Sequence, residues 1–228
     1  MADYLIELLA SLCAVIIVLT LHEFAHAFVA YKCGDPTPKW NGRLSLNPFR
    51  HFDLVGLLCF TFVGFGWAKP VAINPDNFRK YRLGMGLTAS AGIVMNYLTA
   101  LLVYPLYLVV RFYMPSVPFV ADLLEYFFYF VFAYSLSFFV FNLLHLYPLD
   151  GSRILDAFNK RRGKIYRFLR NYGQYILFGL IVESFLCQLL VRFGVPQMAM
   201  FNILGWFMRF ATDILGWPIT ALWGLIPW

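Results

Sequence analysis

The chain has 228 residues, of which 61% are hydrophobic, 20% are aromatic and only 13% are charged; its net charge is +6 and its mean hydropathy is +0.68. A soluble domain of this length needs more charged surface, so the composition excludes a soluble globular protein and predicts an all-α polytopic membrane protein. The four cysteines show no CxxC spacing, which argues against both a disulfide framework and a thiolate zinc site.

Long apolar runs separated by turn-forming residues predict about five transmembrane helices. The last run suits either a span or a helix lying along the membrane interface, because it is amphipathic and rich in Trp, and we favour a span. Within it, Arg209 and Asp213 stand four residues apart and could pair on one helix face. The predicted spans cover about residues 4–31, 83–112, 120–146, 172–193 and 198–228.

The first run contains the sequence His22-Glu23-Phe24-Ala25-His26. Two histidines four residues apart lie on the same face of a helix, where neutral imidazoles can hold Zn²⁺ and the adjacent Glu23 can polarise a water molecule. The alternative is a chance match on a solvated helix face. The flanking residues are apolar, and ionisable groups in such sequence usually serve a function, so we predict a metal site.

The segment at residues 54–73, between the first two predicted spans, has an apolar core that is too short to cross a bilayer as a helix. Its residues 60–63 favour a strand, and Gly56, Gly64 and Gly66 favour turns. We predict a re-entrant or membrane-edge β-hairpin whose edges are covered by protein. An interfacial loop is the alternative.

Fifteen of the 18 Lys and Arg residues lie in two loops, at residues 32–82 and 153–170. This asymmetry predicts that both loops are cytoplasmic. The basic run at 160–164 is expected to face solvent and lipid headgroups rather than nucleic acid, because nothing near it could read bases.

The same orientation predicts where a third metal ligand lies. With both basic loops inside, His22 and His26 come toward the cytoplasmic end of the first span, and Asp150 follows the third span on the same side. A catalytic zinc needs three protein ligands and one open position, so Asp150 is the natural third candidate. The alternative is that Asp150 only shapes the turn where that helix ends.

Together these motifs resemble the site-2 protease family of intramembrane zinc metalloproteases. The resemblance covers about two thirds of the chain, from the first span to just beyond the third. It rests on four segments: the HExxH motif at 22–26, Gly-Trp-Ala-Lys-Pro-Val at 66–71, Ala-Ser-Ala-Gly at 89–92 with Asn96, and Asn142 with Leu-Asp-Gly at 149–151.

The resemblance implies one Zn²⁺ per chain, held by His22, His26 and Asp150, with Glu23 as the general base that acts on a zinc-activated water. It also implies a substrate that is a transmembrane helix of another protein, cleaved within the lipid bilayer near its cytoplasmic side. The identity of the substrate and the oligomeric state stay open.

Asn96 and Asn142 place amides in apolar spans. Each could bond between helices or donate hydrogen bonds to the substrate or an oxyanion, and the resemblance favours substrate contact. A competing class is a non-catalytic zinc-binding scaffold or a metal transporter. The second to fourth spans hold few ionisable residues, which disfavours a transporter, and the presence of Glu23 disfavours an inactive protease.

The chain departs from the family pattern at His145 and Tyr147, which stand where the family usually has proline. His145 could be a fourth ligand, a proton carrier or a hydrogen-bonded core residue. The chain has no room for an inserted PDZ domain or a C-terminal regulatory CBS domain. We therefore expect a minimal member in a prokaryotic cell membrane, with residues 1–228 forming one domain, its core at 4–170 and its C-terminal helices at 171–228.

Overall fold

The computed structural model of the chain describes residues 2–63, 66–114, 118–159 and 161–226. These residues are almost entirely helical and, within the described ranges, form no strand. Among the residues that the structure describes, four helices are long and apolar enough to cross a membrane: α1 (Ala2–Cys33), α4 (Tyr81–Tyr113), α5 (Pro118–Leu143) and α7 (Lys164–Arg192). The prediction of a helical protein with several membrane-spanning segments is therefore confirmed at this level.

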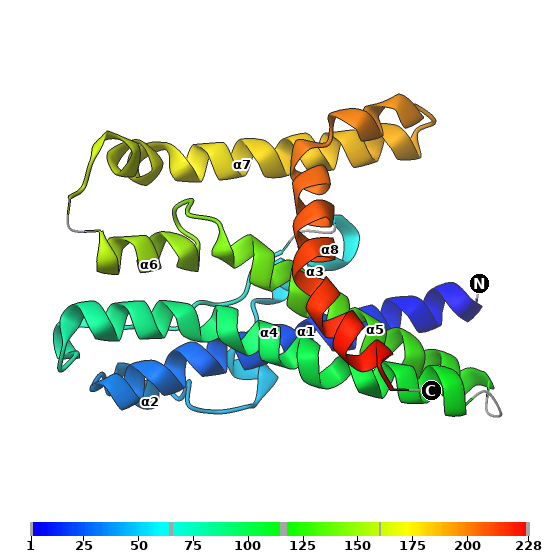
Figure 1. Cartoon of the computed structure of the whole chain (residues 1–228), viewed down its shortest axis with the longest axis horizontal. Helices are drawn as coiled ribbons and strands as arrows, with labels where there is room; N and C mark the ends of the chain where they lie inside the picture. The colour runs from blue at the N-terminus through cyan, green and yellow to red at the C-terminus, as the bar shows by residue number, and fades with distance from the viewer. Residues whose placement is uncertain (1, 64–65, 115–117, 160, 227–228) are drawn as a thin grey trace.

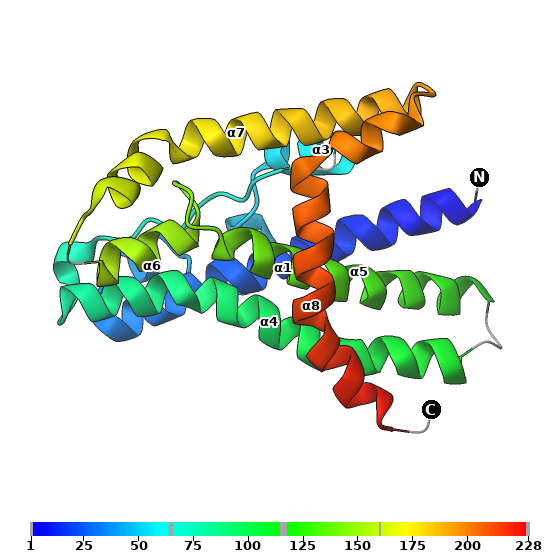
Figure 2. The same cartoon turned by 45° about the horizontal axis from the view of Figure 1, so that its top comes forward.

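Helices α1, α4 and α5 form the central bundle and lie side by side in both views (Figures 1 and 2). Ala14 and Val18 of α1 pack with Val131 of α5 in a buried apolar cluster. The short side chains of Ala14 and Val18 let α5 approach α1 closely, as is typical of helix packing in membranes. This close packing fixes the position of α1 and of the polar residues in its second half.

The C-terminal helix α8 (Ile203–Gly224) follows η3 (Pro196–Phe201) and crosses the central bundle rather than running along it (Figures 1 and 2). Ile219 is 1% exposed and packs with Leu136 and Ala100, and the indole of Trp223 donates to the carbonyl of Leu101 at 3.0 Å. α8 is not among the candidate spans, so the structure supports four spans instead of the five predicted.

The sequence of α8 explains this difference. Arg209 and Asp213 interrupt the apolar sequence in the middle of α8, and with its Gly, Trp and Thr residues they leave no 18-residue stretch apolar enough to count as a candidate span. Among the described residues, Arg209 and Asp213 form no ion pair, and they border separate surface hollows. The predicted i, i+4 pair is therefore not made.

The connection between α1 and α4 differs from its prediction. Instead of a β-hairpin over residues 54–73, the chain forms the helix α3 (Leu54–Val63), so the hairpin prediction is wrong there; Gly64 and Phe65 lie outside the described residues. A short helix satisfies its own backbone hydrogen bonds, whereas an apolar hairpin must find partners for its edges, and this requirement outweighs the weak strand preference of residues 60–63.

The chain makes a short antiparallel contact with the segment before α3 when it returns after that helix. Phe52 and Ala68 form an isolated antiparallel bridge, and the amide of Lys69 donates to the carbonyl of His51 at 2.9 Å. A side chain on Gly56 would meet the carbonyl oxygen of Trp67 at 2.1 Å, so this glycine allows the returning chain to lie against α3. The other elements of this connection are short: α2 (Thr37–Trp40), η1 (Pro48–Arg50) and η2 (Pro75–Asn77).

Helix α6 (Asp150–Phe158) lies against the first half of α4. The two helices approach closely because Gly86 leaves room: a Cβ there would lie 2.5 Å from a ring carbon of Phe158. α5 ends at Leu143, slightly before the predicted end of the third span, and the turn that follows leads directly into α6. Asp150 is therefore the first residue of a helix that packs against α4.

Candidate metal centre

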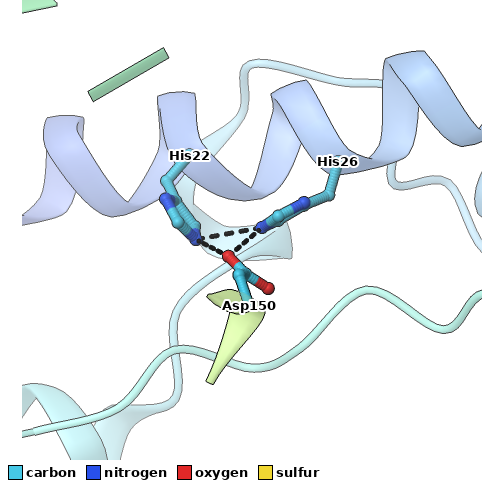
Figure 3. A group of neighbouring side chains, drawn as sticks. All are labelled: His22, His26 and Asp150. Carbon is cyan, nitrogen blue, oxygen red and sulfur yellow. Dashed lines mark hydrogen bonds and ion pairs between the residues drawn. The ribbon is translucent and has the colours of Figure 1, made fainter. Parts of the chain in front are cut away.

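Three buried side chains from two helices converge on one point. His22 and His26 stand one turn apart on α1, and Asp150 reaches them from the start of α6 (Figure 3). The Nε2 atoms of the histidines lie 3.0 Å apart, and the Oδ2 atom of Asp150 lies 3.3 Å from Nε2 of His22 and 3.0 Å from Nε2 of His26. All three residues are buried, at 5–6% exposure.

These distances fit a tetrahedral metal ion. Ligand atoms about 2.0 Å from Zn²⁺ in tetrahedral geometry lie about 3.3 Å from one another, close to the separations observed. The Oδ2 atom of Asp150 is buried and faces the two Nε2 atoms without a well-aligned hydrogen bond, which is costly for a carboxylate oxygen unless a cation faces it. Two imidazoles and a carboxylate are also a ligand set that zinc prefers. Within the described residues, this is the group that could hold a metal ion.

Helix α4 leaves the space in which the two imidazoles stand. A Cβ on Gly92 would lie 2.4 Å from Nε2 of His26 and 2.5 Å from Cε1 of His22, so no other residue fits there without displacing a histidine. The Ala-Ser-Ala-Gly segment at 89–92, singled out in the sequence, thus ends with a residue that borders the metal site directly.

The outer ring nitrogen of each histidine also faces α4. Nδ1 of His26 lies 2.7 Å from the carbonyl oxygen of Thr88, and Nδ1 of His22 lies 3.1 Å from the side-chain amide of Asn96. A carbonyl oxygen can only accept, so Nδ1 of His26 carries the proton and its Nε2 offers a lone pair toward the other ligands. The role of Thr88 left no signal in the sequence, because every residue has a carbonyl.

Asp150 is held in place by its neighbours in the turn before α6. A Cβ on Gly151 would lie 2.4 Å from the carbonyl oxygen of Leu144, so glycine is needed for the turn to close this tightly. The hydroxyl of Ser152 donates to the carbonyl of Leu149 at 2.7 Å. The Leu-Asp-Gly sequence therefore fixes the backbone that presents the carboxylate.

Glu23 lies beside the three residues and is 9% exposed. Its Oε2 atom accepts a hydrogen bond of 3.1 Å from the amide of Val71. Both residues line a cavity of about 230 Å³ that also borders the three converging side chains. Sequence reasoning singled out the segment around Val71 as a motif but gave it no contact with Glu23. The cavity is completed by Trp67, Pro70, Ile73, Asn142, Pro148, Leu149 and Arg153.

The two asparagines occupy different places. Asn142 borders the cavity, and its amide donates to the carbonyl of Phe138 at 3.1 Å. Asn96 is 1% exposed, contacts His22 and is not among the residues described as lining the cavity. His145 is exposed and lies outside the group formed by the two histidines and Asp150. The structure thus favours Asn142 over Asn96 for contact with a ligand in the cavity.

Comparison with known proteins agrees with this description. Over 142 residues the chain is 42% identical to "Putative zinc metalloprotease YwhC" of Bacillus subtilis (strain 168), a match that covers 62% of this chain and 65% of the relative. The chain therefore matches less than two thirds of that bacterial relative. No protein-family model matches the chain, and no solved structure matches it significantly. Fold and site together define a helical membrane protein with a buried His–His–Asp group suited to a metal ion.

Proposed function

We propose that this protein is an intramembrane zinc metalloprotease of the site-2 protease type, which hydrolyses peptide bonds within the transmembrane segments of other membrane proteins. The observation that carries the proposal is the convergence of His22, His26 and Asp150 beside Glu23 on the wall of one cavity. The name of the Bacillus relative supports zinc and proteolysis. The position of three of these residues within α1, a candidate span, supports a reaction inside the membrane.

In this proposal, His22, His26 and Asp150 hold one Zn²⁺. The ion, when bound, supplies a Lewis acid that polarises a carbonyl and makes water acidic near neutral pH. The carboxylate of Glu23 accepts the proton of the attacking water and delivers it to the nitrogen of the leaving amine. The amide of Val71 holds Oε2 of Glu23 and so restricts the orientation of this carboxylate.

The form of the substrate also has to change before cleavage. The peptide bonds of an α-helix are hydrogen-bonded internally and surrounded by side chains, in a cylinder about 10–12 Å wide. The substrate helix must therefore unwind locally so that one peptide bond reaches the cavity of about 230 Å³ beside Glu23. We assign the side-chain amide of Asn142, on the cavity wall, to hydrogen bonding with the unwound peptide or its oxyanion.

The remaining features of the proposal follow the charge distribution. The basic loops at residues 32–82 and 153–170 face the cytoplasm of a prokaryotic cell, and the metal site lies toward that side of a single membrane-embedded domain. The partners are the lipid bilayer and a transmembrane-helix substrate, with no nucleic acid.

Transport would require ligand groups at successive depths, and only one such group occurs among the described residues.

The test is zinc binding and cleavage by the purified full chain in detergent, with a test substrate that contains one transmembrane helix. Wild type should bind one zinc per chain and cleave, and a chelator should abolish cleavage. Glu23→Gln should keep the zinc and lose cleavage, whereas His22→Ala should lose both. Stoichiometric zinc without cleavage of any of several helices would indicate a scaffold or a transporter, and a wild type without zinc would refute the proposal.

A further inference from the structure

The two histidines of the metal centre have different partners at their outer nitrogens. His26 faces the carbonyl oxygen of Thr88, which can only accept a hydrogen bond. His22 faces the side-chain amide of Asn96, which can either donate or accept. The tautomer of His26 is therefore fixed by the backbone of α4, whereas the tautomer of His22 depends on how one amide is turned.

In the structure, the Nδ2 atom of Asn96 points at Nδ1 of His22 from 3.1 Å, and Oδ1 of Asn96 is buried without a hydrogen bond. An amide N–H that donates to Nδ1 requires the imidazole proton to be on Nε2, where it faces Oδ2 of Asp150 at 3.3 Å. This arrangement suits a site without metal. It leaves no lone pair at Nε2 for an ion.

A metal ion at the centre requires the opposite tautomer of His22. Nε2 must then be free of hydrogen, so the proton moves to Nδ1, and Nδ1 needs an acceptor. Turning the amide of Asn96 by 180° exchanges its oxygen and nitrogen with little change of shape. Oδ1 then accepts from Nδ1 of His22 in the same position and at a similar distance.

Asn96 is placed to provide the hydrogen-bond acceptor that Nδ1 of His22 then needs. The residue is 1% exposed and stands on α4, on the helix face that also carries Gly92 and Thr88 at intervals of four residues. Gly92 contributes no side chain, and the carbonyl of Thr88 is engaged with His26. Within the described residues, the amide of Asn96 is thus the group placed to accept from Nδ1 of His22.

We propose that Asn96 is a positioning residue that sets the tautomer and ring orientation of His22 through its side-chain oxygen and so determines the affinity of the site for zinc. The proposal rests on the zinc site proposed above. It replaces the role of substrate or oxyanion contact predicted for Asn96 from the sequence. Residues that orient metal-binding histidines typically contribute 10–100-fold to metal affinity.

The test measures the zinc dissociation constant of the full chain in detergent by competition with a chelator, without substrate. Asn96→Leu removes both donor and acceptor at similar volume and should weaken zinc binding about 10–100-fold. Asn96→Asp keeps an acceptor and should stay within a few-fold of wild type. Thr99→Val is the matched control. Thr99 lies about one turn further along α4 and is 7% exposed, and its hydroxyl donates to the carbonyl of Met95, so loss of the hydroxyl should leave zinc affinity unchanged.

A second readout follows the tautomer itself. With ¹⁵N-labelled histidine, the zinc-loaded wild type and Asn96→Asp should both show the Nδ1 proton of His22 in a hydrogen bond, and Asn96→Leu should lose that signal. Equal zinc affinity of Asn96→Leu and wild type would overturn the inference. If Asn96→Leu does not fold, a folded Asn96→Asp that binds zinc more than tenfold more weakly than wild type would overturn it as well. A wild type that binds no zinc would refute the proposed function instead.

Discussion

The α-carbon of Gly92 faces the metal-binding edge of His26 so closely that a methyl group attached to it would lie 2.4 Å from Nε2. Gly92 is thus one of the residues that shape the site, although it has no side chain. The relationship also explains why a helix in a membrane protein keeps a glycine in its buried interior, where alanine would make a more stable helix by about 1 kcal/mol.

Gly92→Ala should therefore abolish zinc binding while leaving the helical content unchanged. The added Cβ would displace both imidazoles, since it would also lie 2.5 Å from Cε1 of His22. We expect a loss of at least 100-fold in zinc affinity, measured by chelator competition. Gly179→Ala in α7 is the control, because a Cβ there meets nothing within 4 Å. Normal zinc binding by Gly92→Ala would show that the imidazoles stand elsewhere when the metal is bound.

Gly151→Ala should weaken zinc binding from the other side of the site. Its Cβ would lie 2.4 Å from the carbonyl oxygen of Leu144, and the turn must widen to accommodate it. Asp150 would then withdraw from the histidines, and we expect at least a tenfold loss in zinc affinity. Gly163→Ala, just before α7, has no atom within 4 Å of the new Cβ and should bind zinc like wild type. If the two variants bind equally well, the turn is not what positions Asp150.

Val71→Pro should slow hydrolysis without removing the metal. Proline has no amide hydrogen, so the 3.1 Å bond to Oε2 of Glu23 is lost and the base is less well oriented. We expect kcat to fall at least tenfold while the zinc content stays at the wild-type value. Val71→Ala keeps the amide and is the matched control for the lost side chain. A Val71→Pro variant as active as Val71→Ala would show that this bond is irrelevant to the reaction.

Asp35 should stabilise the loops that carry Val71. The residue is fully buried, and its carboxylate accepts from the amide and hydroxyl of Thr37, the amide of Asn74 and the side chain of Asn77. Asp35→Ala leaves these donors unpaired and should cost about 2–4 kcal/mol of stability, measured by thermal unfolding in detergent. Asp76→Asn is the control, because Asp76 is exposed. Equal melting temperatures would contradict this role.

The same contacts predict how this contribution varies with pH. Burial raises the pKa of Asp35, but the hydrogen bonds from Asn77, Thr37 and Asn74 outweigh it and hold the pKa below its usual 3.8. Because the folded-state pKa is the lower one, the stabilisation is fully present above about pH 4 and is lost as the pH falls through the folded-state value. The difference in melting temperature between wild type and Asp35→Asn should therefore narrow below pH 3.8.

The sequence carried most of the information about the ligand residues and little about what surrounds them. The i, i+4 spacing of His22 and His26 determines that they share a helix face, and the distribution of positive charge predicts that Asp150 lies on their side of the membrane. The structure brings the three together as those rules require. Their function as zinc ligands stays a prediction until the metal is measured.

The failed hairpin prediction and the contacts that the sequence did not reveal both depend on interactions between distant segments. Whether residues 54–63 form a strand or a helix depends on partners for the backbone, which local preference does not reveal. The carbonyl of Thr88 and the amide of Val71 act through backbone atoms, so no residue type marks them. Asn96 was recognisable as a polar residue in an apolar span, but its contact with His22 requires knowledge of how α4 is placed along α1.

That placement has a consequence for access to the site. The two histidines keep their contacts with Thr88, Gly92 and Asn96 only at the present position of α4 along α1. A slide of α4 by one helical turn, about 5.4 Å, would bring Gly92 to the position of a hydrogen-bonding residue. A slide of α4 along α1 would therefore displace the imidazoles of both histidines. In the proposed function, a substrate helix enters by displacing other parts of the cavity wall, such as the segment at residues 67–73, while α1 and α4 keep their relative position.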